Sequence, residues 1–419
     1  LLLDDDLWRR TAPVFETKAP RTDSLPLRLS PALQHRCVGC GGACTGVEIG
    51  PVSAPTLSTI EEHRLFEMVD GGRVAADCVN SRPYGAEEAM FMKRSESRCV
   101  MLTAENRCAV HTAGTAEAKP GVCQQFPYTF TRGRDAIYVS LQMECRSLTA
   151  ALASGAEEEP EALLSALRVH SEGPIVNVLP DPIRLAPGVY VTQARYLEWW
   201  ADREGSSLTE MADGAIGWVL SLTGGEAPEW LSTPHWGVAE AIDAGNIRAA
   251  LLQQLGGAAA LLGQEAAKGG RLVEQEQTDL LRKALLIAGG HVLLSPTHWR
   301  DEDGPVLLRK VVTAASAGHD LVRDGDLLYG IGRLQLVHLV TVAMSRLRAI
   351  QAGRVSVTDQ DVNDALVITN VVLRNPYVEQ CLRMGGAAVR AFAAPNLPYA
   401  AWMGVPHPSL LTDAEGSEG

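Results

Sequence analysis

The placement of cysteine constrains this chain more than any other feature. Eight of its nine cysteines fall in one stretch, and the ninth, Cys381, stands alone near the other end. The eight are Cys37, Cys40, Cys44, Cys78, Cys99, Cys108, Cys123 and Cys145. Clustered cysteines in a chain without a secretory signal bind metal more often than they form disulfides, and eight thiols suffice for two four-ligand sites. We therefore predict that all eight are metal ligands, with disulfide bonds as the alternative.

Charge and hydropathy limit the classes of partner that this protein can bind. The formal net charge is −13, with no basic tract, which argues against general affinity for nucleic acid. Residues 1–6 lack the basic and apolar regions of a signal peptide, so we expect a cytoplasmic protein. The best candidate for a membrane span, residues 334–344, is interrupted by Gln335 and His338 and is too short for a bilayer. We expect no membrane partner.

Composition, together with the positions of proline and of acidic stretches, predicts that the chain is divided into four parts. A chain of 419 residues can hold two or three domains. Prolines make residues 1–30 an expected extended arm, and residues 31–150 hold the cysteines. An acidic linker at 151–159 precedes a mainly helical domain at 160–408, and an acidic tail at 409–419 is expected to be disordered. The predicted fold class is α+β: an irregular, metal-pinned cysteine-rich domain followed by a mainly α-helical domain.

Local patterns predict individual elements. A capping box at Ser58–Glu61 favours a helix over 60–68, and residues 136–141 have strand character. Four prolines in 174–192 suggest an irregular crossover. Helical periodicity dominates beyond Thr192, and a capping residue, Thr358, precedes the last long helix. The expected helices span residues 242–262, 279–294, 306–317, 327–350 and 358–375.

The first cysteines have the form of a metal knuckle. Two residues separate Cys37 from Cys40, and Gly39 and Gly41 permit the tight turn that lets both thiolates reach one ion. A redox CxxC motif is the competing interpretation. It leaves the third cysteine, Cys44, unexplained and lacks a βαβ context.

The later cysteines lie in stiffer segments. A polar turn at 105–107 separates Cys99 from Cys108, which suits a short β-ribbon with a thiol on each arm. Lys119-Pro120 precedes Cys123, and Phe126-Pro127 follows it. Proline on both sides restricts the backbone and pre-positions a ligand.

Taken together, these motifs resemble the cysteine-cluster family of zinc- or iron-chelating proteins, which includes the flagellin lysine-N-methylases. The resemblance covers about residues 35–148. The matching positions are Cys37, Cys40 and Cys44 in the opening; Cys99 and Leu102; Cys108, Val110 and His111; Lys119, Pro120, Cys123, Phe126 and Pro127; and Cys145 after a short strand. Two departures are that Ala43 replaces a cysteine before Cys44, and that Cys78 has no place in the pattern. Cys78 either supplies the missing ligand or is a buried thiol.

The resemblance implies a metal site more than a reaction. It implies an iron–sulfur cluster, 4Fe-4S in type, or zinc; spacing alone suits either. For the methylase branch it also implies S-adenosylmethionine, a protein substrate and protein lysine N-methyltransferase activity. The chain has no Gly-rich fingerprint for that cosubstrate, and we assign no catalytic residue. The alternative function is a non-enzymatic scaffold with structural metal sites and a helical domain that binds a partner.

Several other conspicuous residues have plainer explanations. His111, beside the cluster, is a ligand, a donor to a ligand or a surface residue. Gly330 and Gly332 suggest close helix packing rather than nucleotide binding, and His338 suggests a core histidine. The remaining residues are expected to pack in the interior: Trp199, Trp200, Trp218 and Cys381.

Overall fold

A computed structural model describes most of the chain, and it has both helices and sheets, so the fold class is α+β. The described residues are 25–29, 44, 49–52, 54–68, 78–84, 87–95, 98–105, 107–112, 119–142, 145, 176–204, 206, 208–224, 244–268, 272–289, 317–323, 325–373, 375–391 and 393. The expected helix at 306–317, apart from its last residue, and the tail at 409–419 lie outside them. Within them the buried apolar residues form two separate cores.

A four-stranded sheet, in the order β1-β7-β6-β8, contributes to the larger core. Its strands are β1 (Leu27–Leu29), β6 (Tyr128–Arg132), β7 (Ile137–Leu141) and β8 (Val176–Val178). β6 and β7 form an antiparallel hairpin, to which β1 and β8 add in parallel. Every residue of β7 is buried, in agreement with the strand predicted at 136–141. β1 comes from the predicted arm, so part of that segment is a strand of the sheet.

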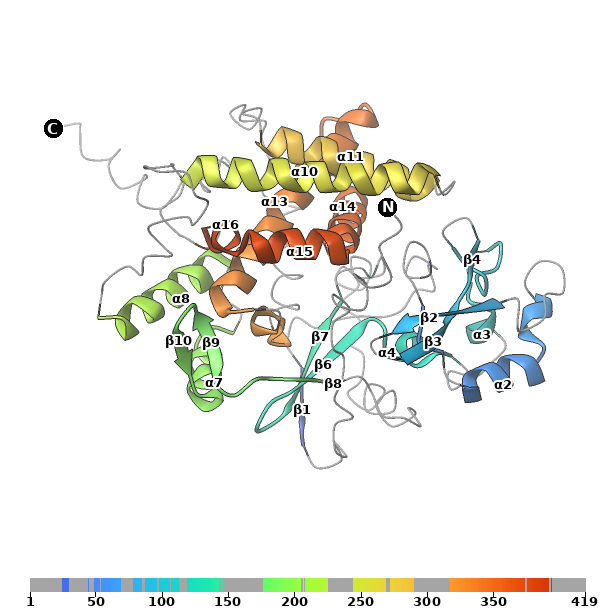
Figure 1. Cartoon of the computed structure of the whole chain (residues 1–419), viewed down its shortest axis with the longest axis horizontal. Coiled ribbons are helices and arrows are strands. Elements are labelled where there is room, and N and C mark those ends of the chain that lie inside the picture. Colours follow the sequence, from blue (N-terminus) through green and yellow to red (C-terminus); the bar gives the residue numbers. More distant parts are fainter. Residues whose placement is uncertain are drawn as a thin grey trace.

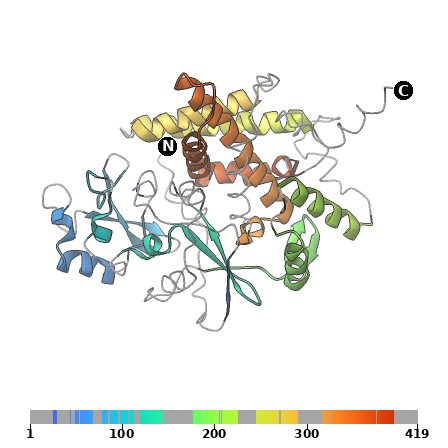
Figure 2. The same ribbon diagram turned by 180° about the vertical axis from the view of Figure 1, so that it is seen from behind.

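The smaller core belongs to the cysteine-rich lobe, which lies at one end of the molecule in both views (Figures 1 and 2). Its elements are α2 (Ala54–Glu62), the 3-10 helix η2 (Leu65–Met68), β2 (Val79–Tyr84), β3 (Glu87–Met92), β4 (Arg94–Ser95), β5 (Arg98–Cys99), α3 (Ala109–Thr112) and α4 (Gly121–Gln125). β2 pairs with β3, and β4 with β5, both antiparallel. The elements are short, as predicted for an irregular segment.

The helix expected over 60–68 begins earlier than predicted. α2 starts at Ala54, so the Ser58–Glu61 capping box lies within it rather than before it. Pro55 stands in the first turn, where its missing N–H costs nothing. Arg64, with φ of 50°, then ends the helix before η2 because left-handed backbone cannot continue a right-handed helix.

The segment at 174–192, predicted to be an irregular crossover, instead supplies three short strands. β8 joins the four-stranded sheet, and β9 (Ile183–Ala186) pairs with β10 (Val189–Val191) in a two-stranded ribbon. The side chains of Ile183 and Leu185 are fully buried, so this ribbon is part of the larger core. Its strands are too short to give a periodic pattern in the sequence.

The rest of the described chain is mainly helical. The helices are α7 (Gln193–Ala201), α8 (Leu208–Leu222), α10 (Ala244–Lys268), α11 (Leu272–Gly289), the 3-10 helix η5 (Asp320–Val322), α13 (Leu327–Gln351), α14 (Asp359–Leu373), α15 (Pro376–Met384) and α16 (Gly386–Ala391). In Figure 1 the α10–α11 pair runs along the upper side. α11 begins seven residues before the predicted start at Asp279, whereas α13 and α14 lie close to their predicted ranges.

α13 is the central helix of the larger core, as predicted. Two glycines let it approach its neighbours closely: a Cβ atom on Gly330 would lie 1.9 Å from the carbonyl oxygen of Leu321, and one on Gly332 would lie 2.0 Å from that of Val389. Both distances are far below a normal contact, which confirms the close-packing explanation of this pair. By length and composition α13 could cross a membrane, contrary to the expectation that no apolar run is long enough. However, 89% of its most apolar window is buried, as in a core helix.

Candidate functional site

Five of the predicted ligands gather in the smaller core. Cys78 and Cys99 are among its buried residues, with 3% and 7% of their surface exposed. Cys44, Cys108 and Cys123 are partly buried and pack against it. These five thiols come from four segments, with Cys99 and Cys108 near each other in the chain, so their shared core is the strongest sign of a common site. We call this group the cysteine core.

Backbone hydrogen bonds hold these segments together. Cys78 precedes β2, and its carbonyl oxygen accepts from the backbone N–H of Lys93 at 2.7 Å. Lys93 in turn accepts from Val100 N–H at 3.1 Å, directly after Cys99. The N–H of Ala109 donates to Met101 at 2.8 Å, which brings the start of α3 against the same turn. The cysteines thus lie on or beside short elements that are joined to one another by backbone hydrogen bonds.

The predicted ribbon with a thiol on each arm is present only in part. Cys99 pairs with Arg94 across β4 and β5, whereas Cys108 forms an isolated antiparallel bridge with Leu102. The chain reverses between the two cysteines, where Thr103 N–H donates to the carbonyl oxygen of Arg107 at 2.8 Å. Cys99 and Cys108 therefore lie on the two sides of one tight turn without facing each other in a strand pair.

Cys123 lies on α4, between Pro120 and Pro127, the two prolines predicted to restrict its backbone. Pro120 is the N-cap residue of the helix, and its carbonyl oxygen accepts from Cys123 N–H at 2.8 Å. Phe126 follows as the C-cap, with extended backbone, before Pro127. The thiol is therefore held by one turn of helix that is fixed at both ends.

Burial and neighbouring thiols disfavour the charged form of these side chains. Burial raises the pKa of Cys99 to about 11; nearby Cys108 and Cys78 contribute in the same direction, and a hydrogen bond from Met101 N–H, 3.5 Å from Sγ, acts against them. Burial also raises the pKa of Cys123 well above its ordinary value, with Cys44, Cys99 and Cys108 adding to the effect. Cys44, Cys99 and Cys108 are therefore the thiols near enough to Cys123 to affect its ionisation.

The donor chemistry suits a thiophilic metal, yet the described residues contain no group of three or more His, Cys, Asp or Glu side chains arranged to hold an ion. The seven described cysteines are thiols rather than disulfides. The knuckle residues Cys37 and Cys40 lie outside the described residues, as does the side chain of His111. The metal site thus stays a prediction.

The remaining two cysteines lie elsewhere. Cys145 is buried in the larger core, beside the hairpin of β6 and β7, rather than among the residues of the cysteine core. Cys381 lies on α15 and is partly buried, less enclosed than the interior thiol expected there. Of the predicted ligand set, the structure therefore brings five together and puts one, Cys145, in a different core.

Of the other conspicuous residues, Trp199 and Trp200 are core residues as expected, whereas His338 and Trp218 are only partly buried. Burial lowers the pKa of His338 to about 4. Trp199 stacks on Trp218 with ring centroids 5.1 Å apart, and Trp199 and Trp200 are both buried in the larger core. They therefore serve packing and do not line an open aromatic cage.

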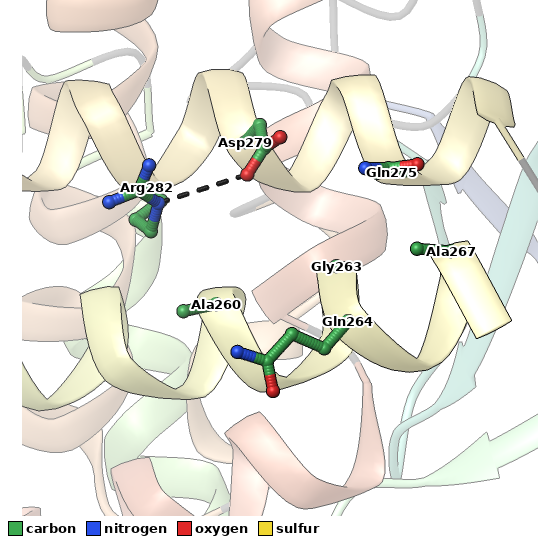
Figure 3. A pocket seen from close by; sticks show the side chains of 7 residues that line it. All are labelled: Ala260, Gly263, Gln264, Ala267, Gln275, Asp279 and Arg282. Atoms are coloured by element: carbon green, nitrogen blue, oxygen red, sulfur yellow. Dashed lines mark ion pairs between the residues drawn. The ribbon is translucent and has the colours of Figure 1, made fainter.

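Two pockets lie away from the cysteines. The first, of about 300 Å³, is a groove between α10 and α11. Figure 3 shows Ala260, Gly263, Gln264 and Ala267 on one helix facing Gln275, Asp279 and Arg282 on the other. The second, of about 270 Å³, is lined by Arg184, Gly325, Asp326, Tyr329, Arg383, Met384, Gly386 and Arg390. This second pocket has no signature in the sequence, because its charged residues are far apart in the chain.

No family model, curated protein or solved structure matches this chain. The resemblance to the cysteine-cluster family consequently rests on the motifs within residues 35–148 alone.

Proposed function

We propose that this protein binds a metal through the thiolates of the cysteine core and belongs to the cysteine-cluster family that its motifs resemble. The observation that carries the proposal is the shared apolar core of Cys44, Cys78, Cys99, Cys108 and Cys123. A single buried thiol is an ordinary packing residue. Five thiols from distant segments in one small core are not required by packing, since any small apolar side chain would fill the same space.

Electrostatics supports a cation at this place. The folded chain raises the pKa of Cys99 and Cys123, first through burial and then through neighbouring thiols. A divalent metal or an iron–sulfur cluster reverses this balance, because a coordinated thiol loses its proton outright. A metal that binds here must therefore displace the protons of Cys99 and Cys123, and its coordination energy must offset that cost.

The electrostatic interactions among the thiols also suggest which cysteines share a site. Cys44, Cys99 and Cys108 all act on Cys123, so we assign these four to one site. Cys78 acts on Cys99 and is the candidate to replace one of them. Cys37 and Cys40, from the knuckle, and Cys145 remain predicted ligands of a second site or of a larger cluster. The resemblance to the methylase branch favours a 4Fe-4S cluster over zinc.

Two activities fit such a protein. The resemblance favours a protein-modifying enzyme of the lysine-N-methylase kind, with S-adenosylmethionine and a protein substrate. A non-enzymatic scaffold is favoured by a different observation: both pockets described above are lined by residues other than cysteine. A cytoplasmic location would support either activity, since thiols stay reduced there.

Purification without oxygen, followed by visible absorption and metal analysis, tests the proposal. We expect stoichiometric metal in the wild-type chain, with broad visible absorption for iron–sulfur and none for zinc. The decisive variants are Cys123→Ser and, as a matched control, Cys381→Ser on α15. Cys123→Ser should lower the metal content, whereas Cys381→Ser should leave it unchanged. Equal and full occupancy in both variants, or no metal in the wild type, would refute the proposal.

A further inference from the structure

The second pocket has an unusual concentration of guanidinium groups. Arg184 reaches it from β9, Asp326 and Gly325 from the start of α13, and Arg383 and Arg390 from α15 and α16. Its volume of about 270 Å³ is at the small end for ligand sites. Three arginines and one aspartate line it, so the charged side chains of its wall sum to about +2.

One of the arginines is fixed by the aspartate. The carboxylate of Asp326 is fully buried and accepts from Arg390 Nε at 3.0 and 2.9 Å and from Arg390 Nη2 at 2.5 Å. The same carboxylate caps α13 by accepting from Tyr329 N–H at 3.0 Å. Arg390 is therefore held rigidly at the wall of the pocket, with its charge offset.

The other two arginines supply the excess charge. Arg383 donates to Glu379 at 2.9 Å and keeps 55% of its side chain exposed, so it can turn toward a ligand. Arg333 also pairs with Glu379, at 3.9 Å, so this carboxylate does not offset the charge of Arg383 alone. Arg184 differs, because no carboxylate among the described residues pairs with it and its buried Nε has no hydrogen-bond acceptor there. A buried donor on a charged group is costly to leave unsatisfied.

We propose that this pocket binds a small dianionic oxyanion, such as the phosphate group of a metabolite. Guanidinium groups present parallel N–H donors that match the oxygen atoms of phosphate, and a dianion balances the net charge of the wall. Arg184 supplies the decisive hydrogen bond, Arg383 closes over the ligand from the exposed side, and Arg390 sets the geometry. This site is independent of the cysteine core and of any metal there.

Calorimetric titration of the full chain tests the site. The probes are inorganic phosphate at about pH 8, where it is dianionic, and acetate as a monoanion, both at one ionic strength. We expect phosphate to bind and acetate to bind at least tenfold more weakly. Arg184→Gln should weaken phosphate binding about tenfold or more, and Arg383→Gln by a smaller factor. The matched control is Arg195→Gln, at an exposed position on α7 outside the pocket, which should bind like the wild type.

A second substitution separates binding from folding. Arg184→Lys keeps the positive charge but lacks the forked donors, so its phosphate affinity should fall between those of wild type and Arg184→Gln. Circular dichroism melting without phosphate identifies any variant that has lost its fold. Arg390→Gln is avoided, because it would leave buried Asp326 unpaired. The proposal fails if wild type binds no phosphate, if acetate binds as tightly, or if folded variants at Arg184 and Arg383 bind phosphate like the control.

Discussion

The ring nitrogen Nδ1 of His319 lies 3.2 Å from the hydroxyl oxygen of Tyr196 inside the larger core. His319 has no exposed surface, and its ring meets those of Tyr138 and Trp200 edge-on, with centroids 4.2 and 5.3 Å away. Its other nitrogen, Nε2, is buried without a hydrogen-bond partner in the described part of the chain. Protonation of the ring would place an unpaired charge among aromatic rings.

This arrangement predicts a loss of stability in mild acid. Burial lowers the pKa of His319 to about 3 and that of His338 to about 4, from an ordinary value of 6.5. Below about pH 6.5 these two histidines therefore bind protons in the unfolded chain but stay neutral in the folded chain. The free energy of unfolding should fall by about 1.4 kcal/mol per pH unit for each histidine, until the folded-state pKa is reached. Denaturant unfolding between about pH 7 and pH 5 measures this slope.

His319→Asn isolates one of the two contributions. His319 has φ of 57°, and asparagine tolerates left-handed backbone better than most residues. The variant should be less stable at neutral pH but should lose about 1.4 kcal/mol less per pH unit on acidification. His63→Asn, at an exposed position after α2, is the control for the loss of a histidine side chain outside the core. An unchanged slope in His319→Asn would contradict the assignment.

Glycine substitutions on two helices should have opposite effects. Gly330→Ala places a Cβ 1.9 Å from the carbonyl oxygen of Leu321, so α13 must shift from η5, at a cost of about 1–3 kcal/mol or more. Gly257→Ala, on exposed α10 surface with nothing near the new Cβ, should be neutral or stabilise by up to about 1 kcal/mol. Thermal unfolding of both variants tests this difference. Equal shifts would mean that close packing at Gly330 is absent in solution.

The sequence predicts those elements whose signals are local. The capping residue Thr358 and the apolar residues that follow locate α14, and the apolar surface of α13 identifies it as a core helix. The strands between 176 and 191 were missed because each has only three or four residues. β8 is a strand only because β6, distant in sequence, offers it a partner.

The same distinction applies to the candidate sites. Cysteine spacing indicates the thiols that gather in the smaller core. It does not indicate that Cys145 packs in the larger one. That difference depends on how the hairpin of β6 and β7 joins the helices. The arginine pocket has no local signature at all, since Arg184 and Arg390 meet only through the packing of β9, α13 and α16.

The start of α14 predicts a measurable capping energy. The carboxylate of Asp361 accepts from Thr358 N–H at 2.9 Å and from Arg354 at 2.6 and 2.7 Å, while Thr358 Oγ1 accepts from Asp361 N–H at 3.3 Å. Burial alone would raise the pKa of Asp361, but these hydrogen bonds outweigh it and lower the pKa to about 2. Its stabilising effect is therefore complete above about pH 4 and is lost as the pH falls toward 2.

Asp361→Asn tests that capping energy. It should lower the free energy of unfolding at neutral pH by about 1–2 kcal/mol, because charge-assisted hydrogen bonds become neutral ones. Asp359→Asn, two residues earlier and exposed, is the control and should cost only a few tenths of a kcal/mol through the helix dipole. Comparable losses in both variants would show that the contacts of Asp361 add nothing beyond its charge.

Metal removal should loosen one core and spare the other. The smaller core holds far fewer buried apolar residues than the larger one, so the energy of metal coordination would form a large part of its stability. Hydrogen exchange with mass spectrometry, before and after chelation, should show amides near Met101 and Val110 exchanging at least about tenfold faster. Amides near Ile331 and Leu336, buried in α13, should be unaffected. Cys123→Ser should reproduce the pattern, and Cys381→Ser should not. Uniform loosening of both cores, or none in either, would mean that the thiols of the smaller core do not depend on a metal.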